Sequence, residues 1–96
     1  MITTKQRAYL RGLANGIDPI FQIGKGGINQ NMVEQINDAL EARELIKLSV
    51  LRTAEQTTRE LCNEMARLTG ADAVQCIGSK FVLYKQSKEH QRIFLD

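Results

Sequence analysis

The sequence predicts a single domain of the α/β class, of the α+β two-layer type, with three helices on a four-stranded mixed sheet in the order α-β-α-β-α-β-β. Its length of 96 residues is the size of one domain. The 43% hydrophobic and 25% charged residues are typical of a globular chain with a modest core. Short apolar runs alternate with segments of helical periodicity, which favours two strand–helix–strand crossovers followed by a hairpin.

Capping motifs predict where the three helices begin. Thr3 with Gln6 forms a capping box before the first helix. Thr57 with Glu60 forms another before the third, and Asn29 is the expected N-cap of the second. Apolar side chains at helical spacing are expected to be buried in each: Leu10, Leu13 and Ala14, then Val33, Ile36 and Leu40, then Leu61, Met65 and Leu68.

Apolar runs predict four strands, at residues 20–23, 45–51, 73–78 and 81–85. Gly78 and Ser79 fall in the turn of the closing hairpin. The domain is expected to cover residues 1–88, with a tail at 89–96. Because the segment from Gln86 onward is mostly polar, it is expected to dock loosely.

Several classes of protein and site are not expected. The chain has no run of about 18 apolar residues that could span a membrane, and residues 1–13 lack the apolar core of a signal peptide. We therefore expect a cytoplasmic protein, and we further expect a monomer. Cys62 and Cys76 form no metal-binding pattern, and His90 is the only histidine, so we expect reduced thiols, no metal and no cofactor. The sequence shows no nucleophile paired with a base, so we do not expect an enzyme.

Charge is segregated along the chain, although the net charge is only +2. Residues 1–25 carry an excess of basic side chains and residues 29–45 an excess of acidic ones. Glu34, Asp38 and Glu41 are expected on a solvated face of the second helix. This distribution favours a polyanionic partner on one side of the domain.

The segment Gly24-Lys25-Gly26-Gly27 lies between a predicted strand and a predicted helix. It lacks the Ser or Thr of a Walker loop, and Asn29 stands where a dinucleotide-binding loop needs its third glycine. A G-x-x-G turn can instead let the backbone of a nucleic acid pass close to the protein backbone, with Lys25 near a phosphate. Taken alone, the residues leave open a second interpretation, in which the glycines only make a strand-to-helix turn.

The aromatic residues do not predict a base-stacking platform on the sheet. Phe21 and Phe81 lie in apolar strands and are expected in the core. Recognition is then expected to depend on phosphates, 2′-hydroxyls and shape.

Four segments resemble a known family: TKQRAYLRGLA (4–14), PIFQIGKGGI (19–28), ELIKLSVL (44–51) and RLTGADAVQCIGSKFVLYK (67–85). They are similar to the CRM domain, the chloroplast RNA splicing and ribosome maturation family, in its bacterial single-domain YhbY-type form. The resemblance covers residues 3 to about 88. It implies an RNA-binding fold similar to the C-terminal domain of translation initiation factor three.

The resemblance also implies which residues contact RNA. They are the loop residues Gly24, Lys25, Gly26 and Gly27, the basic residues Lys5, Arg7 and Arg11 of the first helix, and Lys47, Lys80 and Lys85 as further candidates. The closing hairpin is less basic than the family leads us to expect, which weakens its expected contribution.

The expected function is an RNA-binding protein that associates with ribosomal RNA in precursors of the large ribosomal subunit and assists their assembly. Two alternatives stay open. The acidic helix at 30–44 could dock on a basic protein partner, or Lys25 could hold a small phosphorylated metabolite.

Overall fold

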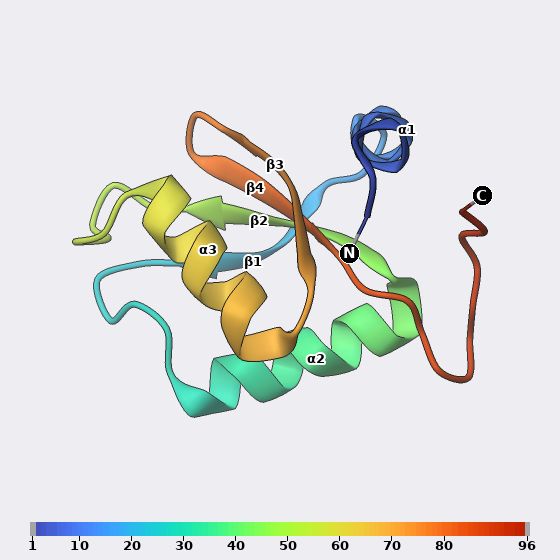
Figure 1. Cartoon of the computed structure of the whole chain (residues 1–96). Helices are drawn as coiled ribbons and strands as arrows, with labels where there is room; N and C mark the ends of the chain where they lie inside the picture. Colours follow the sequence, from blue (N-terminus) through green and yellow to red (C-terminus); the bar gives the residue numbers. More distant parts are fainter. Residues whose placement is uncertain (1, 96) are drawn as a thin grey trace.

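The computed structural model describes residues 2–95, and its elements follow the predicted order (Figure 1). The helices and strands are α1 (Thr4–Ala14), β1 (Pro19–Ile23), α2 (Gln30–Arg43), β2 (Leu45–Val50), α3 (Thr58–Thr69), β3 (Asp72–Ile77) and β4 (Lys80–Tyr84). The predicted α+β class is confirmed, with three helices and one mixed sheet. Among the described residues, no helix is both long enough and apolar enough to cross a membrane.

The sheet has the strand order β1-β2-β4-β3. β1 and β2 are parallel, whereas β4 runs antiparallel to both of its neighbours. Parallel strands joined by a crossover end at the same edge of the sheet. The β3–β4 turn lies at that edge too, because the Val50 N–H donates to the Ser79 carbonyl at 2.6 Å. Three connections therefore meet at one end of the sheet.

The main core lies between the sheet and the pair α2 and α3. Val33, Ile36 and Leu40 of α2, and Leu61 and Met65 of α3, are buried there as predicted. A smaller cluster lies on the other face of the sheet, where α1 contributes Leu10 and Ala14. Figure 1 shows α1 on the face opposite to α2 and α3.

Two predicted core positions were wrong. Leu13 and Leu68 are each 39% exposed. In α3 Cys62 is a further buried position nearer the start of the helix, and in the last turn the buried residue is Thr69 instead. The Thr69 hydroxyl is satisfied there, because it donates to the Met65 carbonyl at 2.7 Å. A leucine at helical spacing near a helix end extends beyond the covered area when the partner layer stops.

The predicted helix starts are confirmed by their hydrogen bonds. Thr3 and Gln6 form a reciprocal capping box, with N–H donors at 2.9 and 3.1 Å from the side-chain oxygens. Thr57 and Glu60 repeat this arrangement at the same distances. The Asn29 side-chain oxygen accepts from the backbone N–H of Met32, the third residue of α2, at 2.8 Å.

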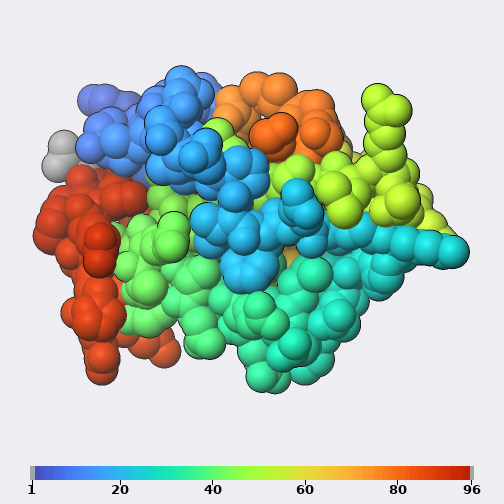
Figure 2. All heavy atoms as spheres, turned by 180° about the vertical axis from the view of Figure 1, so that it is seen from behind, coloured from blue at the N-terminus to red at the C-terminus, as the bar shows by residue number. Residues whose placement is uncertain are grey.

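The tail is bound to the domain, contrary to the expected loose docking. Glu44 is fully buried at the end of α2, and its carboxylate accepts from the N–H groups of Ser87, Arg92 and Ile93 at 2.5–2.7 Å. The Glu41 carboxylate accepts from the backbone N–H groups of residues 88 and 89, each at 3.0 Å. In Figure 2 the tail, drawn in red, lies against blue α1 and the green segment around residues 40–50. Long-range acceptors therefore fix a segment whose own sequence predicts mobility.

Candidate nucleic-acid interface

The turn at residues 24–27 directly follows β1. The Gly27 N–H donates to the Gly24 carbonyl at 3.0 Å, which closes a four-residue turn. Lys25 and Gly26 are exposed at its tip. Two residues later Asn29 caps α2, so the turn lies beside the positive end of a helix dipole.

The fold explains two of the three glycines in this turn. A Cβ on Gly24 would lie 3.2 Å from the Thr53 hydroxyl oxygen, so a side chain would press against the neighbouring loop. Gly27 has φ +64°, in the left-handed region that favours glycine. Gly26 has neither constraint, because a Cβ there would meet nothing within 4 Å and its φ is not in that region. Its missing side chain leaves bare backbone at the exposed tip.

A second loop, residues 51–56, lies beside this turn. The Leu51 N–H donates to the carbonyl of Ile23, the last residue of β1, at 2.8 Å. Arg52 is exposed in this loop and adds a cation that the sequence analysis missed. The predicted strands could have indicated this position, because parallel pairing of β1 and β2 brings together the loops that follow them.

One of the predicted lysines of the hairpin lies at the same end of the sheet. Lys80 is exposed at the start of β4, where it pairs with Ser49 near the end of β2. The turn 24–27, the loop 51–56 and the β3–β4 turn project together in Figure 1. Lys25, Arg52 and Lys80 therefore lie at one end of the sheet, together with the exposed carboxylate of Glu55 in the loop 51–56. Because the cations outnumber this carboxylate, we call the group of Lys25, Arg52 and Lys80 the cationic end of the sheet.

The other predicted contact residues lie elsewhere. Lys85 is at the far end of β4, and its ammonium donates to the Thr69 carbonyl at 2.8 Å, where it caps the end of α3. Lys47 is half-buried on the face that α1 covers, opposite Val82. The structure does not bring either lysine to the cationic end.

The basic residues of α1 form a separate group. The guanidinium of Arg7 donates to the Ala73 carbonyl at 3.2 Å, so this side chain joins α1 to β3. Lys5 is exposed and Arg11 is half-buried on the same helix. The ten predicted contact residues are thus distributed over two faces and both ends of the sheet rather than one patch.

The acidic helix is only partly free to bind a partner. Glu34 and Asp38 are exposed, but the Glu41 carboxylate is occupied by the tail. The Ser87 hydroxyl also donates to Glu41, at 2.7 Å. The predicted row of three solvated carboxylates is therefore reduced to two.

The cysteines are free, as expected. Burial raises the pKa of the Cys62 thiol to about 11, so the group stays protonated and unreactive at neutral pH. Within residues 2–95, no cluster of three or more His, Cys, Asp or Glu side chains could hold a metal ion.

Comparison with known proteins identifies relatives over the whole chain. The "Probable RNA-binding protein YqeI" of Bacillus subtilis is 48% identical, and the match covers 99% of each chain. An "RNA-binding protein" of Haemophilus influenzae is 36% identical over 92% of this chain and 89% of its own length. The solution structure of a hypothetical protein of Staphylococcus aureus, described as a candidate RNA binding protein, superposes with a TM-score of 0.83 at 53% identity, covering 100% of both chains.

The family model of the CRS1/YhbY (CRM) domain matches residues 2–85, which includes every helix and strand described above. The resemblance expected from the four sequence segments is thereby confirmed. This chain belongs to the CRS1/YhbY (CRM) domain family.

Proposed function

We propose that this protein binds RNA and that the turn at residues 24–27 contacts the sugar–phosphate backbone. Gly26 carries the proposal, because the fold gives no reason for a glycine at this exposed tip. A position without a side chain lets another backbone approach closely. The names of the relatives in Bacillus and Haemophilus, which include RNA binding, support the same function.

The cationic end of the sheet supplies the electrostatics of this contact. Lys25 offers an exposed ammonium at the tip, and Arg52 and Lys80 flank it from neighbouring connections. The exposed tip precedes the N-terminus of α2, whose dipole also favours an anion. These groups read charge and shape rather than base identity.

The finer function we propose is association with ribosomal RNA in large-subunit precursors, in the cytoplasm, as an assembly factor without enzymatic activity of its own. The family resemblance motivates this step. Sedimentation of a cell lysate through a sucrose gradient tests it, because the protein should migrate with particles that precede the mature large subunit. Migration only at the top of the gradient in growing cells would contradict the ribosomal part and leave RNA binding to the experiment below.

The alternatives are less well supported. Docking of a basic protein through α2 loses one of its three carboxylates, because Glu41 binds the tail. A phosphorylated metabolite would need groups that converge on it, and Lys25 lies on an exposed tip. Glu34→Ala and Asp38→Ala distinguish the two functions. Both should weaken binding of a basic protein partner if α2 is the docking surface, and both should leave RNA affinity unchanged, since neither side chain lies in the proposed RNA contact.

Substitution of Gly26 tests the RNA contact. Gly26→Asp places a carboxylate against phosphate, where close repulsion costs about 1 kcal/mol or more, and also fills the space a backbone would use. We expect RNA affinity to fall by about tenfold or more with little change in thermal unfolding. Gly26→Ala adds bulk without charge and should lower affinity less.

Gly16→Asp is the matched control. Gly16 is also exposed, has no left-handed φ, and lies before β1 at the opposite end of that strand. Filter binding to ribosomal RNA fragments measures affinity for each variant. A folded Gly26→Asp protein that binds RNA as well as the unaltered protein would mean that the glycines serve the turn alone.

A further inference from the structure

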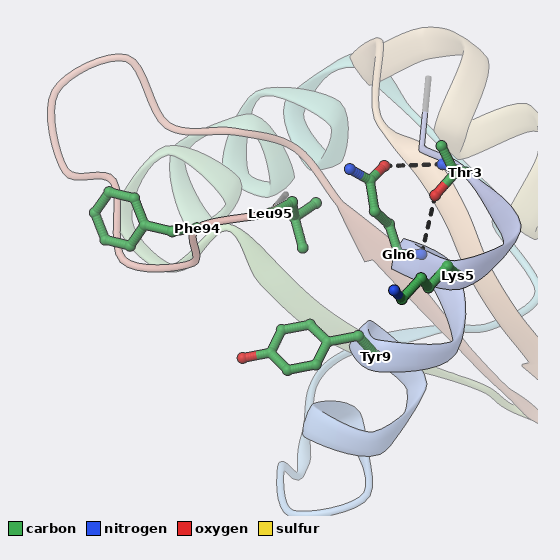
Figure 3. Close-up of a pocket in the computed structure, with 6 residues that line it drawn as sticks. All are labelled: Thr3, Lys5, Gln6, Tyr9, Phe94 and Leu95. Atoms are coloured by element: carbon green, nitrogen blue, oxygen red, sulfur yellow. Dashed lines mark hydrogen bonds between the residues drawn. The ribbon is translucent and has the colours of Figure 1, made fainter.

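A hollow of about 330 Å³ lies between α1 and the tail, at the end of the molecule away from the turn 24–27. We call it the α1–tail pocket; it is lined by Thr3, Lys5, Gln6, Tyr9, Phe94 and Leu95. Figure 3 shows the ring of Tyr9 on α1 and the ring of Phe94 on the tail apart from each other across an open space, with Leu95 on the part of the tail nearer to α1. The volume is at the lower end of the range of about 300–1,000 Å³ that is usual for small-ligand sites.

The two aromatic rings of this pocket are unusually exposed for this chain. Tyr9 is 55% exposed and Phe94 is 72% exposed, whereas Phe81 and Tyr84 are buried and Phe21 is half-buried. Within the described residues the Tyr9 hydroxyl has no hydrogen-bond partner. Exposed aromatic surface that gathers around a hollow indicates a binding site.

The exposure of Phe94 is imposed by its neighbours. Ile93 and Leu95 are partly buried against the α1 core cluster. The Ile93 N–H is also held by the Glu44 carboxylate at 2.7 Å. Both neighbours are anchored on the domain, and the Phe94 side chain between them stays exposed to solvent. The ring is therefore presented in a fixed place rather than left on a loose end.

The remaining lining residues favour an anionic, flat ligand. Lys5 and Tyr9 are four residues apart and share one face of α1. The described lining contains one cation and no carboxylate. The side chains of Thr3 and Gln6 already form the capping box of α1, so aromatic faces rather than hydrogen bonds dominate recognition here.

We propose that the α1–tail pocket holds one base of single-stranded RNA against Tyr9 and Phe94, with a neighbouring phosphate at Lys5. This inference rests on the proposed RNA-binding function and adds a second contact of a different kind. Stacking on an aromatic ring accepts any base, since every base has a π-face. The turn 24–27 would hold backbone at one end of the domain, and the pocket would hold an unpaired nucleotide at the other.

The experiment uses the whole protein and a single-stranded RNA that contains 2-aminopurine, whose fluorescence is quenched when it stacks. We expect quenching on binding. Tyr9→Leu and Phe94→Leu should each reduce it and weaken affinity by about five- to 150-fold, the equivalent of one stacked base. Tyr9→Phe keeps the ring and should bind like the unaltered protein. Lys5→Ala should lower the salt slope by about 0.7, and the leucine variants should not.

Each other outcome overturns a defined part. If the RNA binds and Gly26→Asp prevents it, while the leucine variants bind normally, the stacking site is wrong and the proposed function stands. If the unaltered protein binds no RNA, both are wrong. If Tyr9→Leu instead abolishes self-association in sedimentation equilibrium, the aromatic pair is a contact between two copies of this chain. Thermal unfolding of each variant checks whether a loss of RNA affinity is caused by a loss of fold.

Discussion

The turn at residues 24–27 and the tail at residues 86–95 are both irregular segments, at opposite ends of the domain, but their backbone groups differ in how many hydrogen bonds they make. Within the turn, one backbone hydrogen bond closes the structure, and its tip residues are exposed. In the tail, five backbone N–H groups and one hydroxyl converge on the carboxylates of Glu41 and Glu44. Figure 2 shows the cyan turn projecting at the edge opposite the red tail.

This difference separates a segment built for stability from one available for binding. A buried donor without a partner costs free energy, so the buried N–H of Ser87 and the partly buried N–H groups of Arg92 and Ile93 need the acceptor that Glu44 provides. The exposed tip of the turn has water as its partner and can exchange that water for a ligand. Hydrogen-bond saturation is therefore a better guide to the role of a loop in this chain than its polarity.

Removing the Glu44 carboxylate should release the tail and cause the largest loss of stability. Glu44→Ala leaves the N–H groups of Ser87, Arg92 and Ile93 without their acceptor, and we expect a loss of about 3 kcal/mol in the free energy of unfolding. Urea unfolding measures the loss. Hydrogen exchange of the three amides should accelerate at the same time.

Glu34→Ala is the control for this variant. Glu34 is exposed on the same helix and has no contact with the tail, so its loss should change stability by less than about 0.5 kcal/mol. Equal effects of the two substitutions would mean that the tail hydrogen bonds contribute nothing to stability.

The same contrast explains what could be predicted from the sequence. Helix starts were predictable because a capping box such as Thr57 with Glu60 lies within four residues of chain. The state of the tail was not, because its partners Glu41 and Glu44 are more than forty residues away. Glu44 also has φ +67°, which a local pattern does not predict for a glutamate.

The candidate site was predictable to a similar extent. The turn 24–27 was visible as a cluster of glycines, but only the structure shows that Gly26 is the one without a structural reason. Arg52 was missed because a single arginine in a loop carries no local pattern. Lys85 was included because of its charge, and its bond to the Thr69 carbonyl depends on packing between distant elements.

Acid should release the tail, because protonation of the Glu41 and Glu44 carboxylates weakens the hydrogen bonds that hold it. The Lys88 N–H, the Ser87 hydroxyl and the Glu89 N–H lower the pKa of the Glu41 carboxyl from 4.5 to about 2. A lowered pKa stabilises the fold above the ordinary value and loses this contribution as the pH falls toward the lowered value. Stability should therefore decrease between about pH 4.5 and pH 2.

Burial alone would raise the pKa of Glu44, but its three backbone hydrogen bonds outweigh burial and lower it, so Glu44 acts in the same direction. Glu41→Gln should flatten the acid limb of a stability profile measured by urea unfolding. An unchanged acid limb in this variant would show that other carboxyl groups cause the decrease.

Alanine substitutions should separate the two kinds of glycine in the turn. Gly27→Ala forces a side chain into the left-handed region and should cost about 1 kcal/mol of stability. Gly26→Ala has open space and an ordinary backbone, so stability should be unchanged or increase by up to about 1 kcal/mol. Thermal unfolding compares them, and a clear loss in Gly26→Ala would place this glycine with the structural ones.

The smallest expected effect is at Lys25, and it is visible in salt dependence rather than in stability. Lys25 is exposed and has no hydrogen-bond or ion-pair partner among the described residues, so Lys25→Ala should leave unfolding unchanged. If its ammonium contacts one phosphate, the slope of log K against log salt should fall by about 0.7 to 0.9. Lys85→Ala is the control, because its ammonium caps α3 and should affect stability without changing the slope. Equal slopes for Lys25→Ala and the unaltered protein would remove Lys25 from the contact, and would leave the close approach at Gly26 as the only contribution of the turn to binding.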